Sequence, residues 1–274
     1  MVTNSIRHGR KSLDATLAYI DFCRKAQPEL VKVLDLYAAI FTIQDRYYEG
    51  FVPGSHSGPP SKDSGRPALL GAVPGLQLAD VQRVLKEISE AVAAAAPERQ
   101  SELESSITPH EGECGDLARL VAEAFDPDSS RPSATRTLFL LSLNPFYERF
   151  AAEMVPLVAE TEWQFGHCPI CGERPAIAKY EQSVGTRFLQ CNLCRTQWAQ
   201  DRILCPFCGN RDQDSLGYLS DAPDSAFRVE VCDACRHYIK AVDERALQRE
   251  VILHVEELTI SSLDHEALTR GYQP

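Results

Sequence analysis

Four Cys-x-x-Cys pairs constrain this chain more than any other feature of its sequence. They use eight of its ten cysteines and lie within 68 residues. A Cys-x-x-Cys turn directs two thiolates at one point, so two turns supply the four sulfurs of a tetrahedral site for zinc or for a single iron ion. We therefore predict two four-cysteine metal sites. The expected ligands are Cys168, Cys171, Cys191, Cys194, Cys205, Cys208, Cys232 and Cys235.

The linkers between the pairs favour sequential pairing. Nineteen residues separate Cys171 from Cys191, and twenty-three separate Cys208 from Cys232, which is enough in each case for a β-hairpin. Only ten residues separate the second pair from the third. We expect pairs one and two to form site A and pairs three and four to form site B, with interleaved pairing as the alternative.

Both sites begin with the same local sequence. Gly172 follows Cys168-Pro-Ile-Cys171, and Gly209 follows Cys205-Pro-Phe-Cys208. Proline presets φ within the turn, and glycine accepts the positive φ needed after it, so backbone N–H groups can point at the sulfurs. Short alternating stretches around the pairs indicate the strands of two tandem ribbon or rubredoxin-like modules.

Other uses of paired cysteines fit the sequence less well. Residues 1–12 lack the apolar segment of a secretory signal, so we expect a cytoplasmic, reduced protein without a disulfide framework. A thioredoxin-type redox site needs one reactive pair, not four pairs at ribbon spacing. A purely structural role for both metals stays open, because metal binding supplies folding free energy to small modules.

The remaining cysteines and the neighbouring histidines are not expected to bind metal. Cys23 falls in an apolar helical pattern, which predicts a small buried side chain. Cys114 lies near an expected helix start, where a thiol pKa can be lowered, but most such cysteines are inert. His167 and His237 flank pairs that already supply four sulfurs, so we expect them to lie around the sites or to face solvent.

The charge of the chain argues against nucleic acid as a partner. The formal net charge is −11 over 274 residues, and residues 161–240 contain nine Lys or Arg against ten Asp or Glu. Such a surface is poorly suited to phosphate backbones. No apolar run approaches the roughly 18 residues of a membrane span. One local basic stripe stays open as an alternative, although scattered arginines are more often solvated or paired: Arg187, Arg195, Arg202 and Arg228.

The first 160 residues have helical periodicity. Apolar stripes begin near Leu13 and Leu30, with Pro28 suited to a first turn, and a further stripe follows Asp80, the expected N-cap. Asn144-Pro145 is expected to end one helix and begin the next.

Two further segments complete the outline. Residues 50–67 are rich in Gly, Pro and Ser and predict a mobile loop. The apolar pattern after residue 242 predicts a C-terminal helix, with a short strand over 251–255 as the alternative.

These patterns predict an α+β fold: a helical N-terminal domain, two tandem rubredoxin-like or zinc-ribbon modules, and a C-terminal helix. The expected boundaries are 1–160, 161–203, 204–242 and 243–274. The chain has no phosphate-binding loop, nucleophile elbow, metalloprotease motif or dinucleotide fingerprint. Four cysteines also close a metal shell that a catalytic zinc would leave open. We therefore expect that the protein is not an enzyme.

The cysteine region resembles the FdhE family of formate dehydrogenase accessory proteins. The motifs that support the resemblance are Cys168-Pro-x-Cys-Gly, the run from Gly185 through Cys191-Asn-Leu-Cys194-x-Thr196-x-Trp198, Arg202 before Cys205-x-x-Cys208, and Cys232-Asp-x-Cys235-x-x-Tyr238-x-Lys240. Gln197 and Ala199 depart from the family, in which Glu and His commonly flank the tryptophan. The resemblance is specific over about 168–243.

The resemblance implies a cytoplasmic factor that binds the catalytic subunit of formate dehydrogenase and supports its maturation, with rubredoxin-type iron at the cysteine pairs and zinc as the alternative. We expect Trp198, Arg202 and Tyr238 to form the surface for the client. Two other functions stay open: a rubredoxin-like electron-transfer protein, for which the metal must be iron, and a zinc ribbon that binds nucleic acid.

Overall fold

The computed structural model describes residues 6–55, 60–61, 64–69, 71–97, 117, 120–122 and 133–274. Its helices are α1 (Leu13–Ala26), the 3-10 turn η1 (Pro28–Leu30), α2 (Val31–Gly50), α3 (Leu78–Ala95), α6 (Ser133–Val158), α7 (Glu244–Leu247), α8 (Leu253–Thr259) and α9 (Ser261–Thr269). Its strands are β1 (Ile6–His8), β2 (Pro175–Tyr180), β3 (Arg187–Cys191), β4 (Thr196–Gln200), β5 (Leu216–Leu219), β6 (Phe227–Cys232) and β7 (Tyr238–Asp243).

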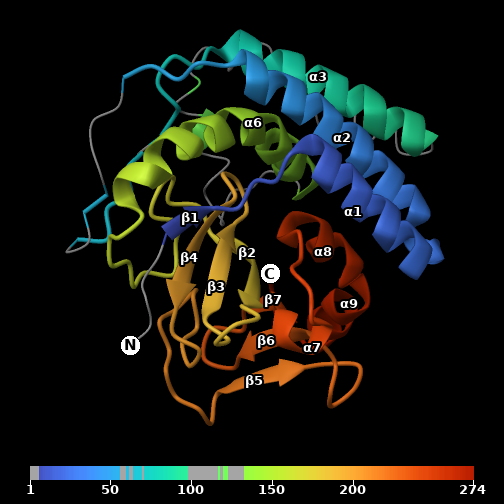
Figure 1. The fold of residues 1–274 in the computed structure, drawn as a ribbon, viewed down its shortest axis with the longest axis vertical. Helices are drawn as coiled ribbons and strands as arrows, with labels where there is room; N and C mark the ends of the chain where they lie inside the picture. Colours follow the sequence, from blue (N-terminus) through green and yellow to red (C-terminus); the bar gives the residue numbers. More distant parts are fainter. Residues whose placement is uncertain are drawn as a thin grey trace.

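The predicted α+β class is confirmed. The N-terminal helices gather at one end of the molecule, the sheet with the cysteine clusters lies at the other, and α8 and α9 pack beside the sheet (Figure 1). The described strands form one mixed sheet in the order β1-β4-β3-β2-β7-β6-β5. The two cysteine modules therefore share a sheet, and the proposed domain boundaries stay predictions.

A parallel pair joins the two modules. β2 of the first module runs parallel to β7 of the second, with Ala178 opposite Ala241, while the pairs inside each module are antiparallel. Side chains alternate across this sheet, so each face has its own core. One face contributes Ile177, Val229 and Val242 to a core with the C-terminal helices, and the other contributes Ala178 and Ala241 to the core under α6.

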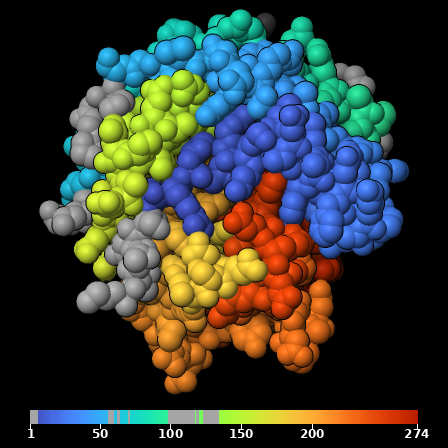
Figure 2. Space-filling view, viewed as in Figure 1, coloured from blue at the N-terminus to red at the C-terminus, as the bar shows by residue number. Residues whose placement is uncertain are grey.

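Strand β1 was not predicted. Its three residues pair with β4, with Ile6 opposite Trp198, and the Ile6 N–H donates to the Ala159 carbonyl at 3.0 Å. So short a segment has too little alternation to register as a strand, and its partner lies nearly 190 residues away. In Figure 2 the N-terminal segment lies between α6 and the C-terminal helices.

Helix starts follow local capping chemistry, with one correction. The Ser12 hydroxyl accepts from the Ala15 N–H at 3.3 Å and caps α1, and Pro28 opens η1 as expected. Asp80 is not the N-cap of α3. That cap is Gln77, and Asp80 lies at the third helical position, where its carboxylate accepts from the Gln77 N–H at 3.1 Å in a capping box.

Helix α6 continues through Asn144-Pro145, so the predicted break is wrong. Proline removes the N–H that would bond the carbonyl of Leu141 four residues earlier. That carbonyl instead accepts from Gln44 Nε2 on α2 at 2.8 Å, so it does not lack a partner. Asn144 is not a cap either. It is buried, and its amide reaches out of the helix to the first cysteine module.

The C-terminal segment forms three helices where one was predicted. The alternative strand at 251–255 is also wrong, because α8 begins at Leu253. Gln248 ends α7 in the left-handed region, with φ of 56°, and so turns the chain toward α8.

His254 of α8 is a titratable group inside the helical core. Its ring is buried, meets Phe41 edge-on at 5.1 Å, and neither ring nitrogen has a hydrogen-bond partner among the described residues. Burial, with the nearby Arg195 and Arg10, holds its pKa well below the usual 6.5. Below about pH 6.5 His254 is therefore protonated in the unfolded chain but stays neutral in the folded chain.

We predict that the free energy of unfolding falls less on acidification in His254→Leu than in the native chain. In the native chain His254 contributes a loss approaching 1.4 kcal/mol per pH unit below about pH 6.5, and the variant lacks this contribution. Urea unfolding at pH 7.5 and 5.5 measures it, with His265→Leu at an exposed position of α9 as the control. Equal pH slopes for the native chain and His254→Leu would contradict the assignment.

Candidate metal centres

The first turn of each cluster has the predicted geometry. Gly172 has φ of 79° and its N–H donates to the Cys168 carbonyl at 3.0 Å. Gly209 has φ of 74° and donates to Cys205 at 2.9 Å. The Ile170 N–H points at the Cys168 sulfur, 3.4 Å away. Pro-x-Cys-Gly thus builds a turn whose amides face the sulfur, which favours the thiolate form.

The second turn of each cluster uses arginine where the first uses glycine. Arg195 and Arg236 follow Cys194 and Cys235 with φ of 55° and 60°. The N–H of Arg236 donates to the Cys232 carbonyl at 2.8 Å, as Gly209 does in the other turn. The left-handed conformation of these two arginines was not predicted from the sequence. The repeated Cys-x-x-Cys-Arg was the available signal, but arginine has no intrinsic preference for the left-handed region.

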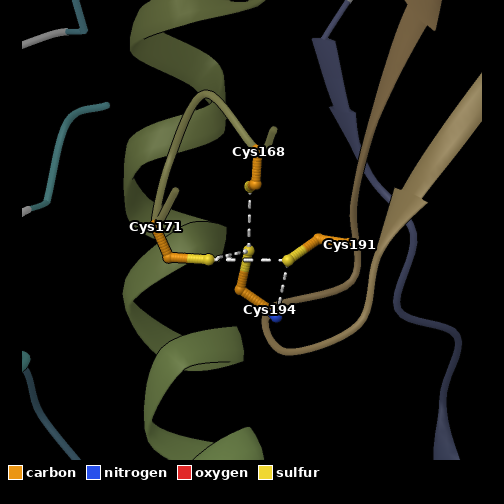
Figure 3. Close-up of side chains that lie close together, drawn as sticks. All are labelled: Cys168, Cys171, Cys191 and Cys194. Carbon is orange, nitrogen blue, oxygen red and sulfur yellow. Dashed lines mark hydrogen bonds between the residues drawn. The ribbon is translucent and has the colours of Figure 1, made fainter. Parts of the chain in front are cut away.

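The cysteines assemble into two separate groups by sequential pairing. Figure 3 shows the four side chains of site A converging on one point beside α6. The Sγ–Sγ distances are 3.5 Å for Cys168–Cys194 and for Cys171–Cys191, and 3.6 Å for Cys171–Cys194. In site B, Cys205–Cys235 measures 3.7 Å and Cys208–Cys232 measures 3.8 Å.

These distances suit a central ion and not disulfides. A tetrahedral ion with metal–sulfur bonds of about 2.3 Å separates its sulfurs by about 3.8 Å. A disulfide needs sulfurs about 2.05 Å apart, and every described cysteine is free. Each group could therefore hold one metal ion.

The acid–base state of site A points to the same conclusion. Burial raises the pKa of Cys171 and of Cys191 well above the thiol value. Burial acts the same way on Cys168, but hydrogen bonds from the other three cysteines hold its pKa well below that value. Without a cation, burial therefore disfavours the thiolate forms of Cys171 and Cys191. A cation among the sulfurs would compensate their charge, which is the chemistry of a tetrathiolate site.

Site A is enclosed by protein on several sides. All four of its cysteines are buried. The Asn144 amide of α6 donates to the Leu193 carbonyl at 2.5 Å, within the second turn. On the first turn, the Pro169 and Ile170 carbonyls accept from the N–H groups of Ala68 and Leu69 at 2.9 and 2.8 Å.

The Gly/Pro/Ser-rich segment therefore ends on site A. The Gly65 carbonyl lies 2.7 Å from Nε2 of His167, and the Ser61 N–H donates to the Arg66 carbonyl at 2.8 Å. Where this segment is described next to site A, at 64–69, it is bound to the protein rather than a free loop.

Site B lies closer to solvent. Cys208 is exposed and Cys235 half-buried, whereas Cys205 and Cys232 are buried. The Cys232 pKa falls to about 7, because the Cys235 N–H and the Asn210 amide donate to its sulfur and outweigh burial. Around it, His237 stacks on Phe207 with ring centroids 5.0 Å apart. Both candidate histidines thus border the clusters without adding a ligand atom to either group of four.

A buried ion-pair network lies behind site A. Arg195 packs against Glu148 of α6 with Nε–Oε1 of 2.7 Å, and Arg10 donates to the other carboxylate oxygen at 2.7 Å. Arg10 also binds Asp45. Arg195 is therefore buried and does not belong to the basic surface stripe considered from the sequence. It anchors the second turn of site A to helices α2 and α6.

The predicted client surface is wrong for two of its three residues. Trp198 is 0% exposed, and its indole N–H donates to the Phe165 carbonyl at 3.1 Å. Tyr238 is 4% exposed and lies under the C-terminal helices. Only Arg202 is exposed. The side chain of a strand residue can lie on the buried or on the exposed face of the sheet, and the sequence does not show which. Here both aromatic side chains lie on buried faces.

The two departures from the family pattern are buried as well. Gln197 accepts from Arg7 Nε at 2.9 Å and donates to Gln190, while Ala199 lies in the core.

Two cysteines lie outside the four pairs. Cys23 is buried, and burial raises its pKa to about 12, as expected of an inert side chain. Cys114 lies outside the described residues.

No helix in the described parts of the chain is long and apolar enough to cross a bilayer. The fold and the two clusters define a class: a helical N-terminal region on a mixed sheet that holds two four-cysteine groups.

Comparisons with known proteins agree on one family. The family model for the FdhE central domain matches residues 167–202. The FdhE homolog of Aquifex aeolicus is 32% identical over 138 residues, which is 49% of this chain and 48% of that protein. FdhE of Escherichia coli O127:H6 is 29% identical over 163 residues, 57% of this chain and 52% of that protein. The matches span about half the length of these relatives.

The fold comparison covers nearly the whole chain. The crystal structure of the FdhE protein from Pseudomonas aeruginosa superposes with a TM-score of 0.65 at 18% identity, over 98% of this chain and 95% of that one. The resemblance to FdhE proteins is therefore confirmed, by sequence in the cysteine region and by fold over the chain.

We predict that the two clusters differ in thiol reactivity. In the protein as purified, iodoacetamide should modify Cys208 at least roughly 100-fold faster than Cys168 or Cys171, because the reagent reaches only the exposed sulfur. Peptide mass spectrometry over time measures the order, and guanidinium-unfolded protein, in which all ten cysteines react, is the control. Equal rates at Cys171 and Cys208 would refute the difference in burial.

Proposed function

We propose that this chain is a formate dehydrogenase accessory protein of the FdhE type. It binds the catalytic subunit in the cytoplasm and supports its assembly or activation, without catalysing a reaction itself. The observation on which the proposal rests is the combination of two four-cysteine groups in one sheet with the FdhE match over 167–202 and along the fold.

Each cluster is proposed to hold one mononuclear ion, with iron favoured by the resemblance and zinc as the alternative. Cys168, Cys171, Cys191 and Cys194 form site A, and Cys205, Cys208, Cys232 and Cys235 form site B. A tetrathiolate ion has no open coordination position, so it fixes the turns and leaves the polypeptide to recognise the client. The backbone N–H groups at the sulfurs orient and stabilise these ligands.

We propose that the two sites have different roles. Site A ties together the first module, α6 through Asn144, and the segment at 64–69. We propose that it holds the helical region on the sheet. Site B shapes the exposed end of the sheet, where the Pro206 carbonyl would lie 1.7 Å from a Cβ at Gly166, so only glycine permits this approach of the two modules. Because Cys208 is exposed, we propose that site B is the site nearer the client surface.

The exposure of Cys208 favours one second candidate, rubredoxin-like electron transfer. A tetrathiolate iron near the surface can exchange electrons with a partner, whereas zinc has no redox change. Reversible reduction of iron-loaded protein, followed in the visible spectrum, would support this candidate. Failure to cycle, or zinc in both sites, removes it and leaves client binding.

We predict that client binding depends on an intact site A. The native chain should bind purified formate dehydrogenase catalytic subunit in titration calorimetry, and Cys171→Ser/Cys194→Ser should lose that binding, because the substitutions release the turns that anchor the helical region. Cys23→Ala, which changes a buried cysteine outside the clusters, is the matched control and should bind normally. A native chain that does not bind, or a double variant that binds equally well, contradicts the proposal.

A further inference from the structure

A cavity of about 270 Å³ lies where the two cysteine modules meet. It is separate from site A and borders site B through Cys205 and Cys232. Its walls come from β2, β3, β5, β6 and β7 and from the segment between β4 and the third cysteine pair. Its charged and aromatic lining residues include Tyr180, Arg187, Arg202, Tyr218, Arg228 and Glu230.

Three arginines line this cavity of an acidic protein. Three guanidinium groups face a single carboxylate, Glu230. That carboxylate is already engaged on both oxygens: Oε1 accepts from the Tyr180 hydroxyl at 2.5 Å and from Arg228 at 3.3 Å, and Oε2 accepts from Arg187 at 2.8 Å. Glu230 balances one guanidinium, and two cysteines of site B also line the cavity, so a carboxylate from outside is favoured only through guanidinium donors that lack a partner.

Arg187 presents an unsatisfied donor at this place. Its side chain is 1% exposed, and Nη1 donates to the carbonyls of Asp201 and Leu204 at 3.0 and 3.1 Å. Its Nε is buried and has no hydrogen-bond partner in the described structure. A buried donor without a hydrogen-bond partner destabilises the fold, so such donors in native proteins usually bind a group such as an ordered water or a ligand.

Aromatic rings hold a second guanidinium at the rim. Arg228 lies over the ring of Tyr180, 4.2 Å from its centroid, and 5.6 Å from that of Tyr218. Tyr218 is 61% exposed, and Ile203, which also lines the cavity, is 45% exposed. A planar guanidinium held by stacking keeps its donor edge available for bidentate binding of a carboxylate.

The cavity borders a sheet edge that can accept another strand. β5 is the last strand of the sheet, with a neighbour on one side only among the described strands. Its residues, Leu216–Leu219, contain no proline and no charge, and such an edge is open to pairing with an extended chain. Tyr218 lies opposite Glu230 in the β5–β6 register, so side chains on this face of the edge point toward the cavity.

We propose that this cavity binds an acidic side chain of an extended polypeptide that pairs with β5. The carboxylate lies against Arg187 and Arg228, and apolar side chains of the same segment pack on Tyr218 and Ile203. The inference rests on the proposed function in one respect: the segment belongs to the client catalytic subunit. The arginines that bind it come from the basic stripe seen in the sequence, of which Arg195 alone lies elsewhere.

The test uses the full chain with two probes. The first is purified formate dehydrogenase catalytic subunit. The second is an acetylated decapeptide of alternating Val and Asp, with a Val and Asn decapeptide as its neutral match. Arg228→Gln removes the stacked charge, and Arg211→Gln, an exposed arginine outside the cavity, is the control. Unchanged melting temperatures establish that both variants fold.

We expect Arg228→Gln to weaken binding of the subunit and of the Asp peptide at least tenfold, and Arg211→Gln to leave both unchanged. The native chain should bind the Asp peptide at least tenfold more tightly than the Asn peptide, and less tightly at high salt. A photo-crosslinker at Tyr218 should label an acidic segment of the subunit, and one at Leu268, exposed on α9, should not.

The outcomes separate the two proposals. If the subunit binds the native chain and Arg228→Gln equally, the cavity is not the docking site and the proposed function stands. If the Asp peptide binds through the cavity and the subunit does not bind at all, the carboxylate site stands and the client is wrong. If the Asp and Asn peptides bind alike or neither binds, the cavity does not recognise carboxylates and the inference falls.

Discussion

The electrostatic cost of placing four sulfurs together governs this structure. In site A they approach to 3.5–3.6 Å inside the protein, where thiolates would repel one another. A central cation would turn this repulsion into attraction and so fix both turns of the site at once. The register of β2 against β3, the docking of Asn144 and the position of 64–69 all depend on those turns.

The two clusters solve the same coordination problem in different surroundings. Site A is backed by α6 and by the Arg195–Glu148–Arg10 network, so its loss would release helices as well as strands. Site B has an exposed sulfur and borders a cavity that three arginines line. The parallel β2–β7 pair joins the two modules in one continuous sheet.

Local chemistry was predictable from the sequence, and long-range pairing was not. Cys-Pro-x-Cys-Gly specifies its turn by proline and glycine within five residues, so the turns and the sequential grouping were predicted. The parallel joining of β2 and β7 and the pairing of β1 with β4 depend on contacts between distant segments, for which periodicity contains no information. The predicted helix break at Pro145 was wrong because the freed Leu141 carbonyl bonds Gln44, which lies on another helix. The surface prediction for Trp198 was wrong because alternation distinguishes the two faces of a strand but does not show which face is buried.

Metal content is the most direct test of the central claim that cations hold this fold together. Elemental analysis of protein purified anaerobically, with the chain concentration from amino-acid analysis, should give about two ions per chain, one for each four-cysteine group. Removal of the ions by a chelator should abolish the cooperative unfolding transition. Folded protein that contains no metal and melts at the same temperature before and after chelation would contradict the account.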